Sequence, residues 1–286
     1  MSASCLFLGA AVHPQYVKDN EREKQWRMVS AVQSDIDSMF DFAARHSDKQ
    51  YRRRGKPIYI HDVQVSGVLL NQRLYDQLED SIAQGQRRKQ GANHSLYEKM
   101  VDRNGFQPYT NLKQVRDSIQ NFLAGEEEDY SPDNLILFMT GHGGQHKPGR
   151  VVEEYFCLPK PGLSANHSAV YTDTMLTEDI TEYLPAGKTL YLIIHSCHSG
   201  GMVNFWKLDP ENEKVALFAS AEADIWAEWN ADDTPSFVQS FCKHAEIGKQ
   251  LCSIAGDIYQ ELYSVPKIRP AFKTTKPEMA TDPFLE

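Results

Sequence analysis

Two runs of five consecutive apolar residues, each followed by turn residues, dominate the hydrophobic pattern of the chain. The first runs from Leu135 to Met139 and leads into Thr-Gly-His142-Gly-Gly, and the second runs from Leu190 to Ile194 and leads into His-Ser-Cys197-His-Ser-Gly-Gly. A continuous apolar run of this length is typical of a strand buried on both faces of a parallel sheet. In open α/β sheets, functional groups collect just beyond the carboxyl ends of such strands. The pattern therefore predicts that neighbouring strands bring His142 and Cys197 together.

The rest of the chain alternates between strand and helix patterns. Apolar residues at helical spacing predict a long amphipathic helix over 21–46 and a last helix over 251–262. Shorter apolar or β-branched runs predict further strands, at residues 5–12, 58–70, 155–158 and 215–219. Short helical pieces are predicted at 74–82 and 96–102, and the proline-containing tail from residue 265 is predicted to be mostly extended. With no internal repeat and no splitting linker, residues 1–286 are predicted to form one α/β domain with a mainly parallel central sheet and helices on both faces.

Capping residues predict where three further helices begin. Asn111 is predicted to cap a helix that Gly125 ends, and Thr177 to cap a helix that Pro185 ends. Thr234 and Pro235 form an N-cap and first-turn pair for a helix over 237–241.

Composition narrows the class of protein. The 286 residues carry a net charge of −9, which argues against a surface for nucleic acid. Five cysteines with no paired spacing predict a reducing compartment without disulfides. No apolar stretch approaches the about 18 residues that a membrane span needs, and the run at 5–12 lacks the basic flank of a signal peptide. We therefore predict a soluble cytoplasmic protein without membrane partners, with an exposed basic loop at 84–93.

The two turn sequences suggest nucleophilic chemistry. A cysteine becomes a nucleophile when an adjacent base or a positive field favours the thiolate. Taken singly, Cys197 would be interpreted as a buried inert thiol and His142 as an ordinary turn residue, although the glycines around His142 would let a bound ligand approach the backbone. Their shared position after buried strands makes a Cys–His dyad the better hypothesis. A zinc site is the rival, with donors drawn from His142, His146, His195, Cys197 and His198, although their spacing is not typical of zinc.

The same two sequences resemble the histidine and cysteine motifs of the caspase-like cysteine peptidases, the clan of caspases, metacaspases, paracaspases and legumains. Thr140-Gly-His-Gly-Gly144 is similar to the Ser/Thr-Gly-His-Gly of that clan, and Ser196-Cys-His-Ser-Gly-Gly201 is similar to the Cys-His-Ser-Gly of metacaspases. The resemblance covers nearly the whole chain and is weakest over 61–105. It extends to Thr110-Asn111, Tyr155-Phe-Cys-Leu-Pro159 and Ala219-Ser-Ala-Glu222.

This resemblance implies a caspase-hemoglobinase fold and cleavage of polypeptide substrates through a thioester acyl-enzyme. Cys197 would be the nucleophile and His142 the general acid/base. The backbone N–H groups of Gly143 and Cys197 would hold the oxyanion. No metal or cofactor is implied for the chemistry, and the sequence does not indicate calcium activation. An activating protein partner stays open as a hypothesis.

The substrate pocket departs from the family pattern. Metacaspases carry Asp two residues before the nucleophile, where it receives a basic P1 side chain, and here that position is His195. Glu222 and Asp224, with Ser220, follow the next strand, where the family places another pocket wall. We predict a basic P1 residue with Glu222 as the main counter-charge, whereas an acidic or neutral P1 would make His195 the selecting residue.

Two other functions use the same residues. Phe138-Met-Thr-Gly-His-Gly-Gly144 also resembles the histidine motif of GPI transamidase, which makes a transpeptidase of the same fold the first alternative. A peptidase-like binding module, inactive or switched on by a partner, is the second. Because only residues 202–214 separate the cysteine motif from the next strand, obligatory cleavage into two chains is not predicted.

Overall fold

The computed structural model describes residues 3–10, 22–47, 58–66, 112–125, 132–147, 149, 151–158, 169–225, 236–265 and 268–285. For residues 22–30, 33, 44, 47 and 58–66 it describes the backbone alone. The helical pieces predicted at 74–82 and 96–102 and the basic loop predicted at 84–93 lie outside the described residues.

A six-stranded sheet takes its strands from nearly the whole length of the chain, in the order β2-β1-β3-β7-β8-β9. The first five strands are mutually parallel, and β9 alone pairs antiparallel, along β8. The strands are β1 (Ala3–Ala10), β2 (Ile58–Ser66), β3 (Asn134–Gly141), β7 (Thr189–His195), β8 (Lys214–Ala219) and β9 (Ala271–Thr274). The predicted mainly parallel central sheet is therefore confirmed.

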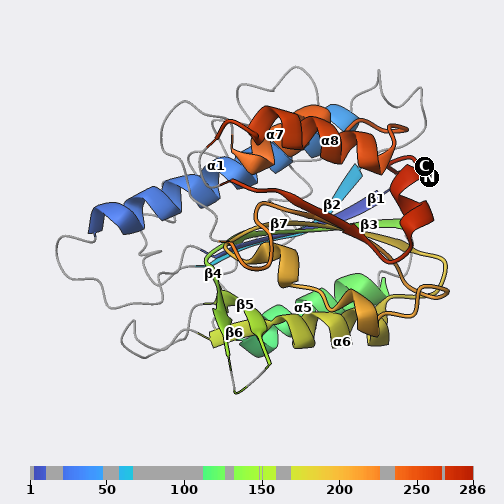
Figure 1. Cartoon of the computed structure of the whole chain (residues 1–286), viewed down its shortest axis with the longest axis horizontal. Coiled ribbons are helices and arrows are strands. Elements are labelled where there is room, and N and C mark those ends of the chain that lie inside the picture. Colours follow the sequence, from blue (N-terminus) through green and yellow to red (C-terminus); the bar gives the residue numbers. More distant parts are fainter. Residues whose placement is uncertain are drawn as a thin grey trace.

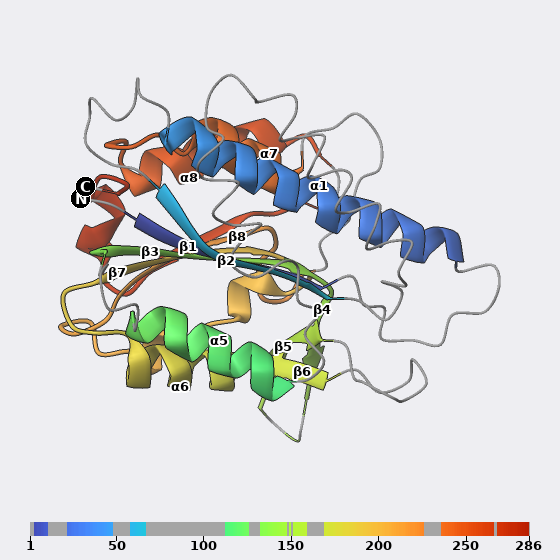
Figure 2. The ribbon, with the colours of Figure 1, turned by 180° about the vertical axis from the view of Figure 1, so that it is seen from behind.

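Helices cover both faces of this sheet (Figures 1 and 2). On one face lie α1 (Arg22–Ser47), α7 (Phe237–His244) and α8 (Leu251–Leu262), and on the other lie α5 (Leu112–Ala124) and α6 (Asp173–Tyr183). This layered arrangement confirms the predicted α/β class with helices on both faces. None of the described helices is long and apolar enough to cross a bilayer.

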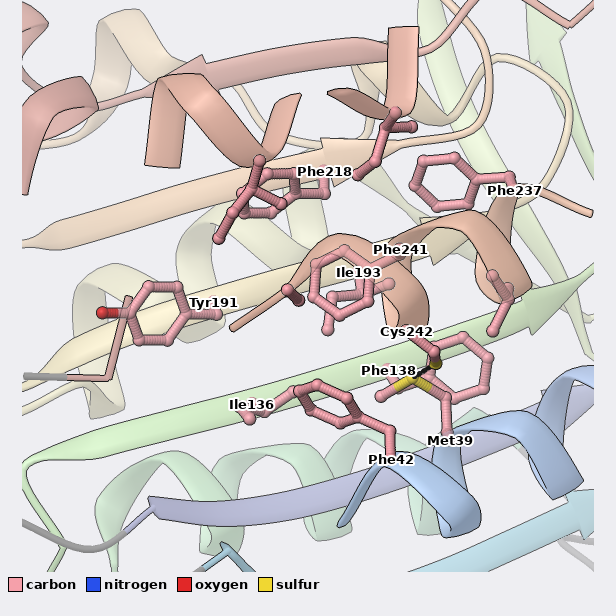
Figure 3. Packing of buried hydrophobic residues seen from close by; sticks show 14 of the residues in the cluster. Met39, Phe42, Ile136, Phe138, Tyr191, Ile193, Phe218, Phe237, Phe241 and Cys242 are labelled. Atoms are coloured by element: carbon pink, nitrogen blue, oxygen red, sulfur yellow. Dashed lines mark hydrogen bonds between the residues drawn. The ribbon is translucent and has the colours of Figure 1, made fainter. Parts of the chain in front are cut away.

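Both apolar runs are buried on both faces, which explains their lack of alternation. In β3, Ile136 and Phe138 pack toward α1 and α7, whereas Leu135, Leu137 and Met139 pack toward α5 and α6. The face toward α1 is rich in aromatic rings (Figure 3). Phe7 meets Phe40 edge-on at 5.4 Å, an arrangement that adds about 0.5–1.5 kcal/mol to simple burial.

A second, three-stranded antiparallel sheet grows from the end of β3. It has the order β4-β5-β6 and consists of β4 (Gly143–His146), β5 (Glu153–Leu158) and β6 (Ala169–Thr172). His142 is the one residue between β3 and β4, so it lies where the chain passes from the main sheet into the small one. The small sheet is visible beside the main sheet in Figure 1.

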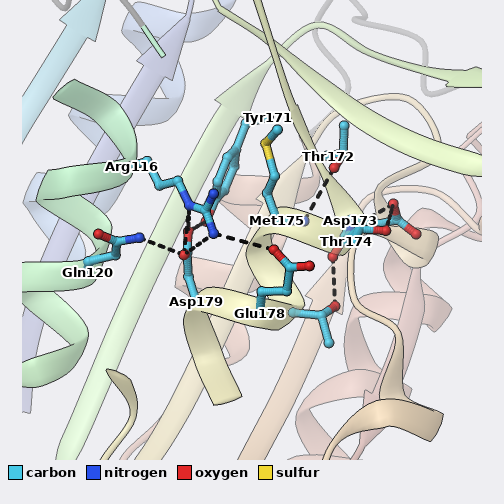
Figure 4. A network of polar contacts seen from close by, with 10 residues as sticks. Arg116, Gln120, Tyr171, Thr172, Asp173, Thr174, Met175, Glu178 and Asp179 are labelled. Carbon is cyan, nitrogen blue, oxygen red and sulfur yellow. Dashed lines mark hydrogen bonds and ion pairs between the residues drawn. The ribbon is translucent and has the colours of Figure 1, made fainter. Parts of the chain in front are cut away.

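Polar contacts around one buried carboxylate, that of Asp179, tie α5, α6 and β6 together (Figure 4). The fully buried carboxylate of Asp179 accepts hydrogen bonds from Arg116 Nε at 2.8 Å, Gln120 Nε2 at 2.8 Å and Tyr171 Oη at 2.8 Å. Glu178, which is exposed, adds a longer contact of 3.4 Å to the same guanidinium. These hydrogen bonds fasten helices α5 and α6 to each other and to strand β6 of the small sheet.

Two predicted helix starts are wrong. Thr177 was predicted to cap α6, but this helix begins at Asp173 and is capped by the hydroxyl of Thr172. Thr177 lies inside the helix, where its hydroxyl donates a hydrogen bond to the carbonyl of Asp173. A hydroxyl near an acidic residue is equally typical of a cap and of an interior turn, so the sequence does not separate them. For α7 the predicted cap was Thr234, whereas the residue that caps the helix is Ser236, which forms a capping box with Gln239.

The tail is not mostly extended. It contains the edge strand β9 and the 3-10 helix η4 (Pro277–Thr281), whose Met279 is buried. Phe284 is also fully buried, against Phe42 and Tyr191. A few apolar residues among prolines carry no periodic pattern, but the open sheet edge and the core beside it give them a place to pack.

Candidate active site

His142 and Cys197 follow two strands that lie next to each other. Strands β3 and β7 pair in parallel, and Thr140 of β3 stands opposite His195 of β7. Each candidate residue comes two positions after this pair, so both lie at the same carboxyl edge of the sheet. His142 is half-buried and Cys197 is 4% exposed.

The main chains at the two strand ends touch. A Cβ placed on Gly143 would lie 2.4 Å from the carbonyl oxygen of Cys197 and 2.9 Å from the hydroxyl of Ser196. Only glycine permits this approach. The carbonyl of His142 is held at 2.8 Å by the N–H of Cys157 in β5. Glycine was predicted to let a ligand approach, whereas at this position it lets the protein's own second loop approach.

The hydroxyl groups of two serines, Ser220 and Ser199, hold the loop that carries Cys197. The Ser220 hydroxyl accepts from the N–H of Ser196 and donates to its carbonyl, both at 3.2 Å. The Ser199 hydroxyl accepts from the N–H of Ala221 at 3.1 Å. The 3-10 helix η2 (Ser199–Gly201) then turns the chain away. Ser220 is buried in these contacts, and its role in substrate binding stays a prediction.

His195 is buried and contacts a carboxylate that the sequence analysis did not identify. Its Nδ1 lies 2.6 Å from Oδ2 of Asp35 in α1, and Thr140 donates to the same oxygen at 2.7 Å. Ser236, the cap of α7, donates to Oδ1 at 3.3 Å. An ionised carboxylate only accepts hydrogen bonds, so the arrangement places a proton on Nδ1 of His195. The acidic group that contacts His195 is therefore Asp35, whereas Glu222 was predicted as the counter-charge of a basic P1 side chain.

Glu222 and Asp224 are exposed on a turn after β8. The turn is closed by a hydrogen bond of 3.2 Å from the N–H of Ile225 to the carbonyl of Glu222. Their position at the carboxyl edge of the sheet agrees with the place predicted for them, and their contact with substrate stays a prediction.

A further carboxyl group, Glu154 of β5, lies against the cysteine loop. A Cβ placed on Gly201 would come within 2.5 Å of this carboxyl group, and Gln145 donates to it at 3.2 Å. Burial raises the pKa of Glu154 above its ordinary value, and the hydrogen bond from Gln145 opposes this effect.

The described part of the chain contains no cluster of donors of the kind that the zinc hypothesis requires. No group of three or more His, Cys, Asp and Glu side chains there could hold a metal ion. His195 contacts Asp35, whereas His198 contacts the carbonyl of Ala223. All five cysteines carry free thiols, and burial raises the pKa of the Cys5 and Cys242 thiols, that of Cys242 to about 12.

Asp35, Gln145 and Glu154 escaped the sequence analysis, although two of them left a signal. Asp35 falls on the apolar stripe of α1, three residues after Val32 and four before Met39. A charged side chain at such a buried position is costly unless another polar group pairs with it. Glu154 alternates with Phe156 and Leu158 on the buried side of β5. Gln145 gave no signal, because a polar residue after a glycine turn is common.

Comparison with known proteins supports the fold. Neither a protein-family model nor a curated protein sequence matches the chain. Among solved structures, protein GSU0716 from Geobacter sulfurreducens is similar over 100% of both chains, with a TM-score of 0.54 and 15% identity. The Drosophila initiator caspase Dronc matches with a TM-score of 0.47 and 10% identity, over 99% of this chain and 82% of its own. Caspase-1 from Spodoptera frugiperda matches with a TM-score of 0.37 and 18% identity, over 62% of this chain and 75% of its own. The similarity to the Geobacter protein concerns the fold alone, and the two caspases are too distant in structure to support a functional argument.

Proposed function

We propose that this protein is a caspase-like cysteine endopeptidase with Cys197 as nucleophile and His142 as general acid/base. The observation that carries the proposal is the placement of the two motifs at the carboxyl ends of adjacent parallel strands, with Gly143 against the carbonyl of Cys197. Neither motif would be informative alone, but together they supply a thiol and an imidazole at one sheet edge.

The chemistry follows from these two groups. The Cys197 thiolate attacks the carbonyl carbon of the scissile bond, and the resulting tetrahedral intermediate collapses to a thioester as the amine leaves with a proton from His142. His142 then takes a proton from water, the hydroxide adds to the thioester, and the peptide acid and the thiolate are released. The N–H groups proposed to hold the oxyanion, from Gly143 and Cys197, belong to the two segments whose main chains touch.

Replacement of either member of the dyad tests the proposal. Cys197→Ala and His142→Ala should each lower kcat/KM on an internally quenched peptide library by roughly 10³-fold or more, because dyad residues act as a unit. The matched controls are Cys252→Ala, at an exposed cysteine of α8, and His146→Ala, at an exposed histidine of β4. Full turnover by a folded Cys197→Ala protein would end the cysteine-peptidase proposal.

For the P1 residue we propose a basic side chain, with Glu222 as counter-charge. Glu222 is exposed and follows Ala221, which packs against Cys197, whereas the imidazole of His195 is held by Asp35. Glu222→Gln should lower kcat/KM for peptides with Arg or Lys at P1 about tenfold and leave neutral P1 residues within about twofold.

Glu246→Gln, an exposed substitution that changes the net charge equally, is the control for this experiment. A library profile dominated by Asp, Glu or Asn at P1 would contradict the choice of Glu222 and make His195 the selecting residue.

A further inference from the structure

The backbone carbonyl of Ala223 forms hydrogen bonds with side chains from both candidate loops. Nε2 of Gln145, three residues after His142, donates to it at 2.6 Å. Nδ1 of His198, the residue after Cys197, lies 2.8 Å from the same oxygen. Ala223 itself stands between Glu222 and Asp224. Three segments far apart in the sequence therefore meet at one acceptor.

The chemistry of the acceptor fixes both donors. A carbonyl oxygen has two lone pairs and no proton, so it accommodates two donors and requires that Nδ1 of His198 carry hydrogen. The amide of Gln145 has a second hydrogen, which it donates to Glu154 at 3.2 Å. Both neighbours of this nitrogen are acceptors, so the orientation of the Gln145 amide is fixed as well.

The backbone of His198 adds a second observation. Its φ of 57° lies in the left-handed region, which is sterically unfavourable for a residue other than glycine. The same residue donates its N–H to the carbonyl of Ile225 at 3.0 Å. Its main chain and its side chain therefore both hold the 223–225 turn, and these contacts offset the strained conformation next to Cys197.

We propose that Gln145 and His198 are positioning residues that act through the Ala223 carbonyl. They set the place of the Cys197 loop relative to the His142 loop, and they hold Glu222 and Asp224 beside both. This inference rests on the proposed peptidase function for its kinetic consequence, but not for its structural one. Neither residue needs to touch the substrate.

The experiment uses neutral variants that separate the donor from the backbone strain. His198→Gly removes the imidazole and tolerates a φ of 57°, whereas His198→Asn also tolerates it and offers an amide nitrogen at the position of Nδ1. Gln145→Met removes the second donor at nearly constant shape, and His146→Met, its exposed neighbour in β4, is the control. Thermal unfolding first establishes that each variant is folded.

Hydrogen exchange followed by mass spectrometry measures how firmly the Cys197 loop and the 220–225 segment are held. His198→Gly and Gln145→Met should each speed exchange about tenfold in the peptides that span 197–202 and 220–225, the size expected for one lost hydrogen bond. His198→Asn and His146→Met should leave both peptides as in the unmodified protein. Unchanged exchange in His198→Gly, or equal acceleration in His198→Asn, would overturn the proposal.

Kinetics on the best library peptide read the catalytic consequence. His198→Gly should lower kcat about 10- to 100-fold with KM within about threefold, since misplacement by about 1 Å costs this much in rate. His198→Asn should restore most of kcat. A loss confined to KM, or an Asn variant no better than Gly, contradicts a positioning role. If the unmodified protein cleaves no peptide, the proposed function fails, and hydrogen exchange alone still decides whether the shared carbonyl holds the three segments.

Discussion

At Gly143 a single added methyl group would push the two loops of the candidate site apart. The added Cβ of Gly143→Ala would lie 2.4 Å from a backbone oxygen of the Cys197 loop, which no rotation of a side chain relieves. The two strand ends must therefore separate. We expect kcat on a cleaved peptide to fall about 10²-fold or more, because reacting groups displaced by about 1 Å lose this much.

The control for this substitution is Gly256→Ala. Gly256 lies in α8 with nothing within 4 Å of an added Cβ. Its replacement should raise the free energy of unfolding by about 0.5–1 kcal/mol and leave kcat unchanged, since alanine favours the helix. Unaltered kcat in Gly143→Ala would show that contact between the two loops does not matter for turnover.

The pairing of α5 with α6 depends on one buried carboxylate. Asp179→Asn keeps the shape of the side chain but removes the charge that faces Arg116 and one of the two oxygens that accept from Gln120, Tyr171 and Arg116. We expect the free energy of unfolding to fall by about 2–3 kcal/mol, measured by urea denaturation.

Glu178→Gln is the matched comparison on the same helix. Glu178 reaches the same guanidinium at 3.4 Å from an exposed position, so its loss should cost less than about 1 kcal/mol. Equal effects of the two substitutions would show that burial of Asp179 does not set its contribution.

The stability of the whole molecule should fall in mildly acidic solution. Burial, with a smaller contribution from Arg45, lowers the pKa of His46 in α1 from 6.5 to about 4. The unfolded chain therefore binds a proton between these values while the folded protein does not. The contribution of the neutral, buried His46 to the free energy of unfolding is fully present above pH 6.5. It is lost progressively as the pH falls from 6.5 through 4, and the loss is about 3 kcal/mol in total.

Urea titrations at a series of pH values between 4 and 7 measure this dependence. In His46→Gln the slope of the unfolding free energy over this window should flatten, whereas His146→Gln, at an exposed site, should keep it. An unchanged slope in His46→Gln would assign the acid sensitivity to other groups. Below pH 4.5, Glu261 acts in the same direction, because its ion pair with Lys243 and its hydrogen bonds outweigh burial and lower its pKa to about 2.

The amino-acid sequence by itself determined the elements whose surroundings repeat regularly along the chain. The runs before His142 and Cys197 are apolar at every position because β3 and β7 are covered on both faces, so the pattern alone indicated two interior strands and the candidate turns at their ends. The long helix α1 and the last helix α8 were equally visible, since one face of each is buried over many turns.

Only the tertiary structure decided which groups meet at the strand ends. The carboxylate that holds His195 comes from a residue 160 positions away. The carbonyl shared by Gln145 and His198 is a backbone group of Ala223, so no side chain at that position indicates its role. The short strands β4, β6 and β9 likewise form because a partner strand is present, not because four residues prefer that conformation. Local periodicity records how an element is buried, whereas contacts between distant segments are set by the packing of the whole chain.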